Sequence, residues 1–202
     1  QLRDWKFELI ATDIDNTALA RAESGLYTQF EVQRGLPIQL LMKYFEQAEK
    51  GWRIKQELKS RVSFRQLNLL DDFSRLGQFD IVFCSYGAIC WLSDLHQWAT
   101  RIQAILKPGG RLVAVEFHPY SYIFDEDWKL AYTYFAEGKA YTWEDGIHDY
   151  VRDSGENLTP SGYEEGVSDF VNPHRVHEFS WGIGEIVTAI AQAGLRIEEL
   201  RE

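Results

Sequence analysis

Side chains that can bind a nucleoside or move a proton follow four of the apolar runs in this sequence. They are Asp13, Asn68, Ser85 with Tyr86, and Glu116 with His118. An acidic side chain at the end of a strand in a nucleotide-binding fold accepts hydrogen bonds from ribose hydroxyls, and Asp13 suits this role. The neighbouring Asp15 suits the cap of a following helix better, and Asp13 also fits an ordinary turn.

Three of these side chains, Glu116, His118 and Tyr86, are candidates for the acceptor side of a reaction. His118 is the strongest candidate for a general base, because imidazole titrates near neutral pH. The alternative is a histidine that bonds a nearby backbone or tyrosine group. A general base is needed only if the acceptor must lose a proton, so a carboxylate acceptor would need none.

The apolar runs predict strands that alternate with helices. Strands are expected at 7–12, 62–67, 79–84, 111–117 and 195–200, and helices at 17–24, from Pro37, at 95–106 and at 183–193. This alternation is typical of βαβ units, so we predict an α/β fold with a mostly parallel, Rossmann-like sheet in one domain spanning 1–202. Because parallel strands finish at one edge, Asp13 and Asn68 are expected to face a common crevice.

Two segments stand apart from this alternation of strands and helices. The motif Lys107-Pro108-Gly109-Gly110 predicts a turn between a helix and the following strand. Residues 120–178 are rich in aromatic and acidic side chains and lack the strand–helix rhythm. We interpret them as an insertion of loops, with a possible hairpin, over the end of the sheet.

The charge and cysteine content narrow the classes of function. The 202 residues carry a net charge of −10, which opposes non-specific binding to nucleic acid or to an anionic membrane surface. Cys84 and Cys90 have no partner at metal-ligand spacing, so we interpret them as buried free thiols. No apolar run is long enough to insert into a membrane, and the cytoplasm is the expected location.

The first part of the chain carries short motifs whose order matches one known family. They are Ala11-Thr12-Asp13-Ile14-Asp15, Lys43-Tyr44-Phe45, Trp52-Arg53-Ile54-Lys55-Gln56-Glu57-Leu58, Asn68-Leu69-Leu70 and Phe79-Asp80-Ile81-Val82-Phe83-Cys84. Through them residues 7–83 resemble the catalytic domain of the chemotaxis-receptor glutamate methyltransferases, the CheR family. The resemblance implies S-adenosylmethionine (SAM) as cofactor, with Asp13 on the ribose and Asn68-Leu69 against the adenine. It also implies a small antiparallel subdomain within about 25–60 that contacts the receptor.

The second part departs from that pattern. Ser85-Tyr86 stand where the family has Arg-Asn, and Cys90 stands where it has a substrate-side tyrosine. Residues 84–202 instead resemble a different small bacterial class I methyltransferase. The matching motifs are Ser85-Tyr86-Gly87-Ala88-Ile89-Cys90-Trp91-Leu92, Glu116-Phe117-His118-Pro119 and Ser180-Trp181-Gly182-Ile183-Gly184-Glu185. Both resemblances imply SAM, with Ser85 and Tyr86 near it, and they differ in the methyl acceptor.

Both families place a strand and a Gly-rich loop ahead of the segment that begins at Trp5, and we expect this sheet to lack both. We predict a SAM-dependent methyltransferase whose acceptor is a small molecule or a protein carboxylate. One alternative is the protein-glutamate O-methyltransferase of bacterial chemotaxis, with a receptor glutamate as substrate. Another is a non-catalytic, methyltransferase-like binding module. A dehydrogenase is disfavoured, because no Gly-x-Gly-x-x-Gly follows a strand.

Overall fold

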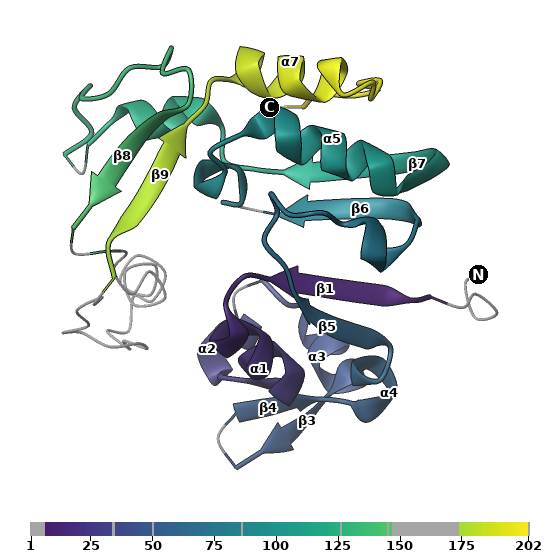
Figure 1. The fold of residues 1–202 in the computed structure, drawn as a ribbon. Coiled ribbons are helices and arrows are strands. Elements are labelled where there is room, and N and C mark those ends of the chain that lie inside the picture. Colours follow the sequence, from purple (N-terminus) through teal and green to yellow (C-terminus); the bar gives the residue numbers. More distant parts are fainter. Residues whose placement is uncertain are drawn as a thin grey trace. The chain divides into compact units, whose positions relative to one another are not determined.

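A computed structural model describes residues 7–33, 35–49, 51–85, 87–125, 127–144, 146 and 174–201 (Figure 1). The chain divides into two compact units, Gln1–Asn68 and Leu69–Glu202. Helices and strands alternate through both, and two of the strand pairs are parallel, as the α/β prediction requires. The single domain predicted over 1–202 stays a prediction.

The first unit holds one parallel strand pair and one small antiparallel sheet. Its elements are β1 (Leu9–Asp13), α1 (Asn16–Ser24), β2 (Leu26–Tyr27), α2 (Gln29–Gln33), α3 (Ile38–Tyr44), β3 (Phe45–Ala48), β4 (Gly51–Ile54), α4 (Gln56–Lys59) and β5 (Val62–Gln66). β1 pairs in parallel with β5, and β4 lies between β2 and β3 in the antiparallel sheet. That sheet falls within the range where the CheR resemblance implies an antiparallel subdomain.

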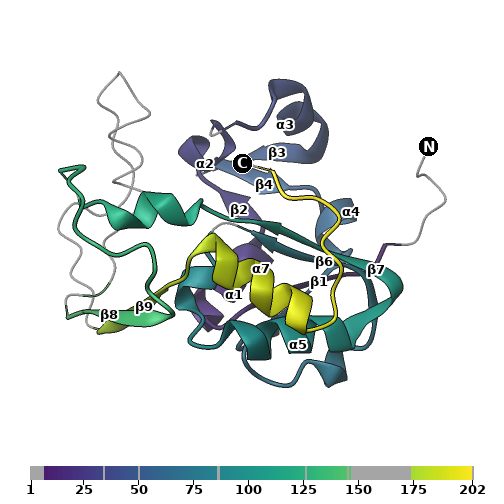
Figure 2. The same cartoon turned by 90° about the horizontal axis from the view of Figure 1, so that it is seen from above.

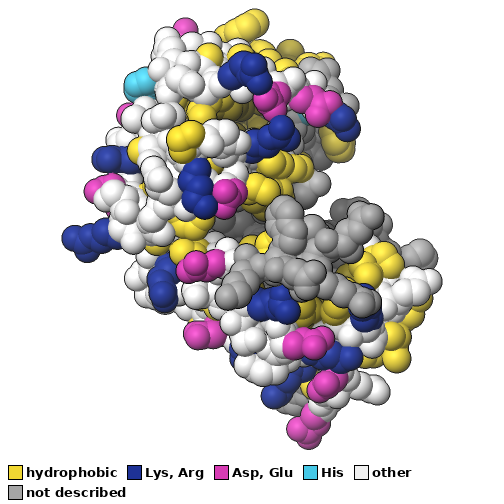
Figure 3. Space-filling view, turned by 90° about the vertical axis from the view of Figure 1, so that its right-hand side faces the viewer, with side chains coloured by type: hydrophobic (Ala, Val, Ile, Leu, Met, Phe, Trp, Pro, Cys, Tyr) yellow, Lys and Arg dark blue, Asp and Glu magenta, His cyan; other side chains and the backbone are white. Residues whose placement is uncertain are grey.

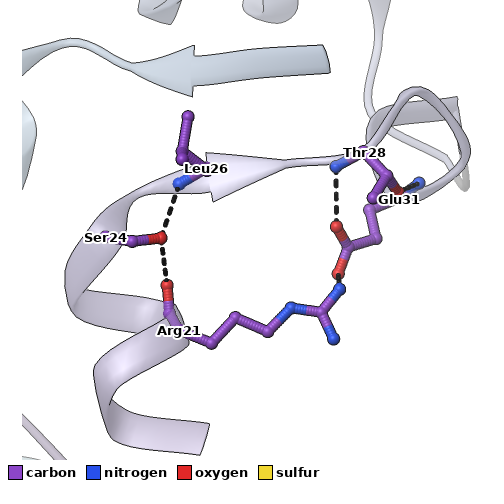
Figure 4. Close-up of polar contacts among 5 residues, drawn as sticks. All are labelled: Arg21, Ser24, Leu26, Thr28 and Glu31. Carbon is purple, nitrogen blue, oxygen red and sulfur yellow. Dashed lines mark hydrogen bonds and ion pairs between the residues drawn. The ribbon is translucent and has the colours of Figure 1, made fainter. Parts of the chain in front are cut away.

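Local side-chain hydrogen bonds set both ends of α1. The Asp15 carboxylate accepts the Thr17 N–H at 2.7 Å, and Gly25 ends the helix in the left-handed conformation at φ 68°. Beyond the helix, the Glu31 carboxylate accepts the Thr28 N–H and one Arg21 N–H, each at 2.8 Å (Figure 4). This carboxylate ties the start of α2 back to α1.

The second unit holds a parallel strand pair, two packed helices and an antiparallel pair. Its elements are η1 (Ser74–Leu76), β6 (Phe79–Ser85), η2 (Ile89–Trp91), α5 (Leu95–Ile105), β7 (Leu106–Val115), η3 (Pro119–Ile123), β8 (Lys139–Trp143), β9 (Val176–Ser180) and α7 (Ile183–Gln192). α5 and α7 lie side by side in both ribbon views (Figures 1 and 2). The inner face of α5 buries Trp98, Ala99 and Ile102 almost completely. This apolar face holds the helices in place beside β6 and β7.

Two sequence predictions differ from the structure. The predicted strand at 195–200 was wrong, because residues 195–201 form no strand. Alternating apolar residues do not by themselves supply the ladder partner that a strand requires. The predicted turn at 107–110 lies inside β7: the parallel register passes from Phe79↔Leu106 to Ile81↔Arg111, so the turn forms an irregularity within the strand.

The surface carries both signs of charge. Acidic and basic side chains are interspersed on the face drawn in Figure 3, without one large basic area there. Within the described ranges, no helix combines the length and the apolar character needed to cross a bilayer.

Candidate functional site

The carboxyl ends of β1 and β5 bring the predicted nucleoside-binding residues to one edge. Asp13 pairs with Gln66 across the parallel ladder, and the Leu67 N–H donates to the Asp13 carbonyl at 2.9 Å. Asn68 follows one residue later, and both Asp13 and Asn68 are exposed. The predicted common edge is therefore present, while the roles of Asp13, Asn68 and Leu69 toward a cofactor stay predictions.

The Asp13 carboxylate retains capacity for a ligand. Its Oδ1 accepts the Asp15 N–H at 2.9 Å, which forms the turn that leads into α1. Its Oδ2 accepts no hydrogen bond from the described part of the chain, and the side chain is open to solvent. A carboxylate held this way can accept hydrogen bonds from a diol, so it fits the ribose of SAM. The competing assignment of Asp15 as the helix cap is confirmed.

Glu116 holds the loop that follows β6. Its Oε2 accepts the Gly87 N–H at 2.5 Å, and its Oε1 accepts the N–H groups of Ala88 and Ile89 at 2.9 and 3.2 Å. The side chain is half-buried. Both oxygens are thus engaged with backbone donors, which suits a positioning residue better than a group that transfers protons.

His118 also bonds the backbone, as the alternative interpretation of this residue requires. Its Nδ1 accepts the Tyr120 N–H at 3.1 Å and caps η3. In a neutral ring with Nδ1 as acceptor, the proton resides on Nε2. The catalytic role of His118 stays a prediction.

The remaining predicted site residues lie at the end of β6. Ser85 is the last residue of the strand and is exposed, whereas Tyr86 lies outside the described residues. Cys90, at the position of the family's substrate-side tyrosine, donates its thiol hydrogen to the Gly87 carbonyl at 3.3 Å. Cys84 and Cys90 are free, with Cys84 buried and Cys90 half-buried. Burial, together with a smaller contribution from nearby carboxylates, raises the pKa of the Cys90 thiol to about 12, so the group is neutral.

Sequence reasoning missed a cavity of about 500 Å³ within the second unit. Its wall includes Tyr122, Tyr141, Trp143 and Glu178. The period-two spacing of Tyr141 and Trp143 was available as a signal for a shared strand face. The partner strand lies more than thirty residues away and could not be assigned from spacing alone.

Parallel strand pairs joined through helices, with an acidic side chain exposed at a strand end, are the arrangement of an α/β nucleotide-binding fold. The model of the family described as "CheR methyltransferase, SAM binding domain" matches residues 1–115, which is more than half of the chain. The chain therefore belongs to the CheR methyltransferase family. The match runs past residue 83, where the sequence resemblance was expected to end.

Curated relatives carry chemotaxis names. The chain is 39% identical over 107 residues to "Chemotaxis protein methyltransferase Cher2" of Pseudomonas putida and to "Chemotaxis protein methyltransferase 1" of Pseudomonas aeruginosa. These matches cover 52% of this chain and 39% of each relative. Escherichia coli has a "Chemotaxis protein methyltransferase" that is 33% identical over 124 residues, 58% of this chain and 43% of that protein. The chain thus spans about two fifths of the length of these relatives.

Two solved structures described as S-adenosylmethionine-dependent methyltransferases align with this chain. One from Clostridium acetobutylicum aligns with a TM-score of 0.48 at 13% identity, over 95% of this chain and 65% of that chain. One from Mesorhizobium loti aligns with a TM-score of 0.43 at 16% identity, over the same shares.

Proposed function

We propose that this chain provides the SAM-binding part of a protein-glutamate O-methyltransferase that acts on chemotaxis receptors. The family match over residues 1–115 carries the proposal, because it contains Asp13 and Asn68 at one strand edge. The names of the relatives favour a receptor glutamate, which was an alternative in the sequence analysis, over a small-molecule acceptor.

In this proposal residues at and just beyond the carboxyl ends of β1 and β5 hold the nucleoside. The Asp13 carboxylate accepts hydrogen bonds from the ribose hydroxyls, and Asn68 with Leu69 lies against the adenine. Ser85 and Tyr86 are assigned to the cofactor as well, on the resemblance alone. SAM supplies a methyl group on a positively charged sulfur, and the protein's task is to align that group with the acceptor oxygen.

The hydrogen bonds of the two base candidates agree with a carboxylate acceptor. Glu116 is engaged by three backbone N–H groups, and the Nδ1 of His118 by one. A glutamate side chain is already ionised at neutral pH, because its ordinary pKa is about 4.3. It can attack the methyl group without giving up a proton, so neither residue has to act as a base.

Titration of the full chain with SAM and with S-adenosylhomocysteine, followed by calorimetry, tests the cofactor site. Asp13→Ala should weaken binding by about 1–3 kcal/mol, the loss expected when hydrogen bonds to a charged group are removed. Glu23→Ala removes another exposed carboxylate of the same unit, in α1, and should leave the affinity unchanged. Equal affinities of Asp13→Ala and the unmodified chain would refute the assignment of Asp13.

The acceptor is tested separately with receptor cytoplasmic fragments and SAM labelled in its methyl group. Methyl transfer to glutamate gives an ester that alkali releases as methanol, and fragments with Gln in place of the acceptor Glu serve as the control. Transfer that alkali does not release, or that persists with the Gln fragments, would contradict the proposed acceptor.

A further inference from the structure

Aromatic side chains make up half of the residues that line the cavity of the second unit. It measures about 500 Å³ and lies among η2, η3 and the β8–β9 pair. The rings on its wall are Tyr122, Phe124, Tyr132, Tyr141, Trp143 and Phe179. Its volume falls in the range of small-molecule sites, which combine apolar walls with a few polar groups.

Strand register fixes the polar group that faces these rings. Tyr141 and Trp143 are two residues apart on β8 and share one face, and Glu178 on β9 stands directly opposite Tyr141. The Trp143 indole N–H donates to Glu178 Oε2 at 2.8 Å, and the rings of Tyr132 and Tyr141 meet edge to face at 5.2 Å. The carboxylate is therefore held beside oriented rings.

The charges around the cavity are negative. Asp125, Asp127 and Glu178 line it, while no Lys, Arg or His among the described residues does. Asp127 pairs with Lys129 at 2.7 Å, and Oδ1 of Asp125 accepts two backbone N–H groups. Glu178 has no Lys or Arg partner in the described part of the chain, so its charge stays uncompensated beside the rings.

Two further groups on the cavity wall, the Cys90 thiol and the Tyr122 hydroxyl, are neutral. Burial raises the pKa of the Cys90 thiol to about 12 and also raises that of the Tyr122 hydroxyl, so both stay protonated near neutral pH. The charge of Glu178 shifts both pKa values in the same direction. An electron-rich ring already attracts a cation in this region: the Lys139 ammonium lies 4.8 Å from the centre of the Tyr141 ring.

We infer that this cavity binds an organic cation, an alkylated ammonium group that packs against the rings with its charge toward Glu178. Aromatic faces and a nearby carboxylate together form the type of site that selects a positively charged, weakly hydrated group. The inference goes beyond the proposed methyl transfer and does not depend on it.

Choline and its uncharged isostere 3,3-dimethyl-1-butanol are the probes, titrated into the full chain and followed by ligand-observed NMR. Choline should bind at least about tenfold more tightly, because only the charge differs between the two ligands. Equal affinities, or no choline binding, would overturn the inference.

Matched variants locate the site. Glu178→Gln keeps an oxygen for the Trp143 N–H and should weaken choline binding about tenfold, with little effect on the neutral isostere. Glu144→Gln is the control, because Glu144 directly follows β8 and pairs with Arg175 without lining the cavity. Trp143→Leu, checked for folding by circular dichroism, should weaken both ligands. Equal losses in Glu178→Gln and Glu144→Gln would show that the cation binds elsewhere.

Discussion

Replacing Glu116 by Gln separates two roles that this carboxylate could have. As a loop anchor, Glu116 needs an acceptor at both oxygens, because three N–H groups converge on it from Gly87, Ala88 and Ile89. An amide of the same shape supplies one oxygen and one NH₂ group. If the oxygen stays on Ala88 and Ile89, the NH₂ faces the Gly87 N–H and one hydrogen bond is lost.

The expected loss follows from that single hydrogen bond. A hydrogen bond to a charged group contributes about 1.5–3 kcal/mol, and the unpaired donor adds to the loss when it is shielded from water. Opening of the loop should therefore become about ten- to hundredfold more frequent. Amide hydrogen exchange at Ala88 and Ile89, followed by NMR, measures this opening directly.

The control is Glu144→Gln, whose partner Arg175 is exposed and whose ion pair contributes little. It should leave the exchange of the 87–89 amides unchanged. A residue that acts only in proton transfer could be replaced by its amide without loosening the loop. Unchanged exchange in Glu116→Gln would therefore refute the anchoring role.

Three further substitutions or reactions test other parts of the structure. Gly138→Ala should destabilise the second unit by several kcal/mol in urea unfolding, because Gly138 has φ 72° and an added methyl group would overlap the Trp181 ring. Asp15→Ala should lower the free energy of unfolding by about 1 kcal/mol, since it removes the hydrogen bond to the Thr17 N–H, and Asp15→Asn should restore most of it. Cys90 should react slowly with iodoacetamide at pH 8 in the folded chain, because its pKa is raised to about 12, and mass spectrometry should show fast reaction in urea. The raised pKa of Cys90 also lowers the free energy of unfolding as the pH rises above about 9, since the unfolded chain then loses a proton that the folded chain keeps. Equal alkylation rates in the folded and the urea-unfolded chain would contradict the raised pKa.

Local features of the fold could be predicted because their partners lie close in sequence. Asp15 and Gly25 cap α1 through groups two or three residues away, so residue types alone were enough. The parallel pairing of β1 with β5 was also expected from the two apolar runs and from the polar residues that end them. The shared edge of Asp13 and Asn68 follows from that pairing.

Features that depend on distant partners could not be predicted. The strand expected at 195–200 begins with apolar residues at alternate positions, but this pattern gives no information on whether a neighbouring strand edge is available. The cavity needs β8 and β9, and its central carboxylate, Glu178, meets Tyr141 only through their register. The backbone partners of Glu116 precede it by 27–29 residues, so its type and position indicated chemistry but not anchoring.

Asp13 and Glu116 show that the number of backbone hydrogen bonds at a strand-end carboxylate distinguishes a group that can bind a ligand from one that anchors a loop. Asp13 is the last residue of an apolar strand and Glu116 directly follows one, and the sequence makes both candidates for ligand chemistry. The structure gives Asp13 one backbone donor and leaves its Oδ2 open to solvent, while Glu116 receives three donors over both oxygens. Substitution should therefore separate them. Asp13→Ala should weaken SAM binding and leave the fold nearly as stable, whereas Glu116→Gln should loosen the 87–89 loop whether or not SAM is present. If both substitutions changed SAM affinity alone, counting backbone donors would have failed to distinguish a binding carboxylate from an anchoring one.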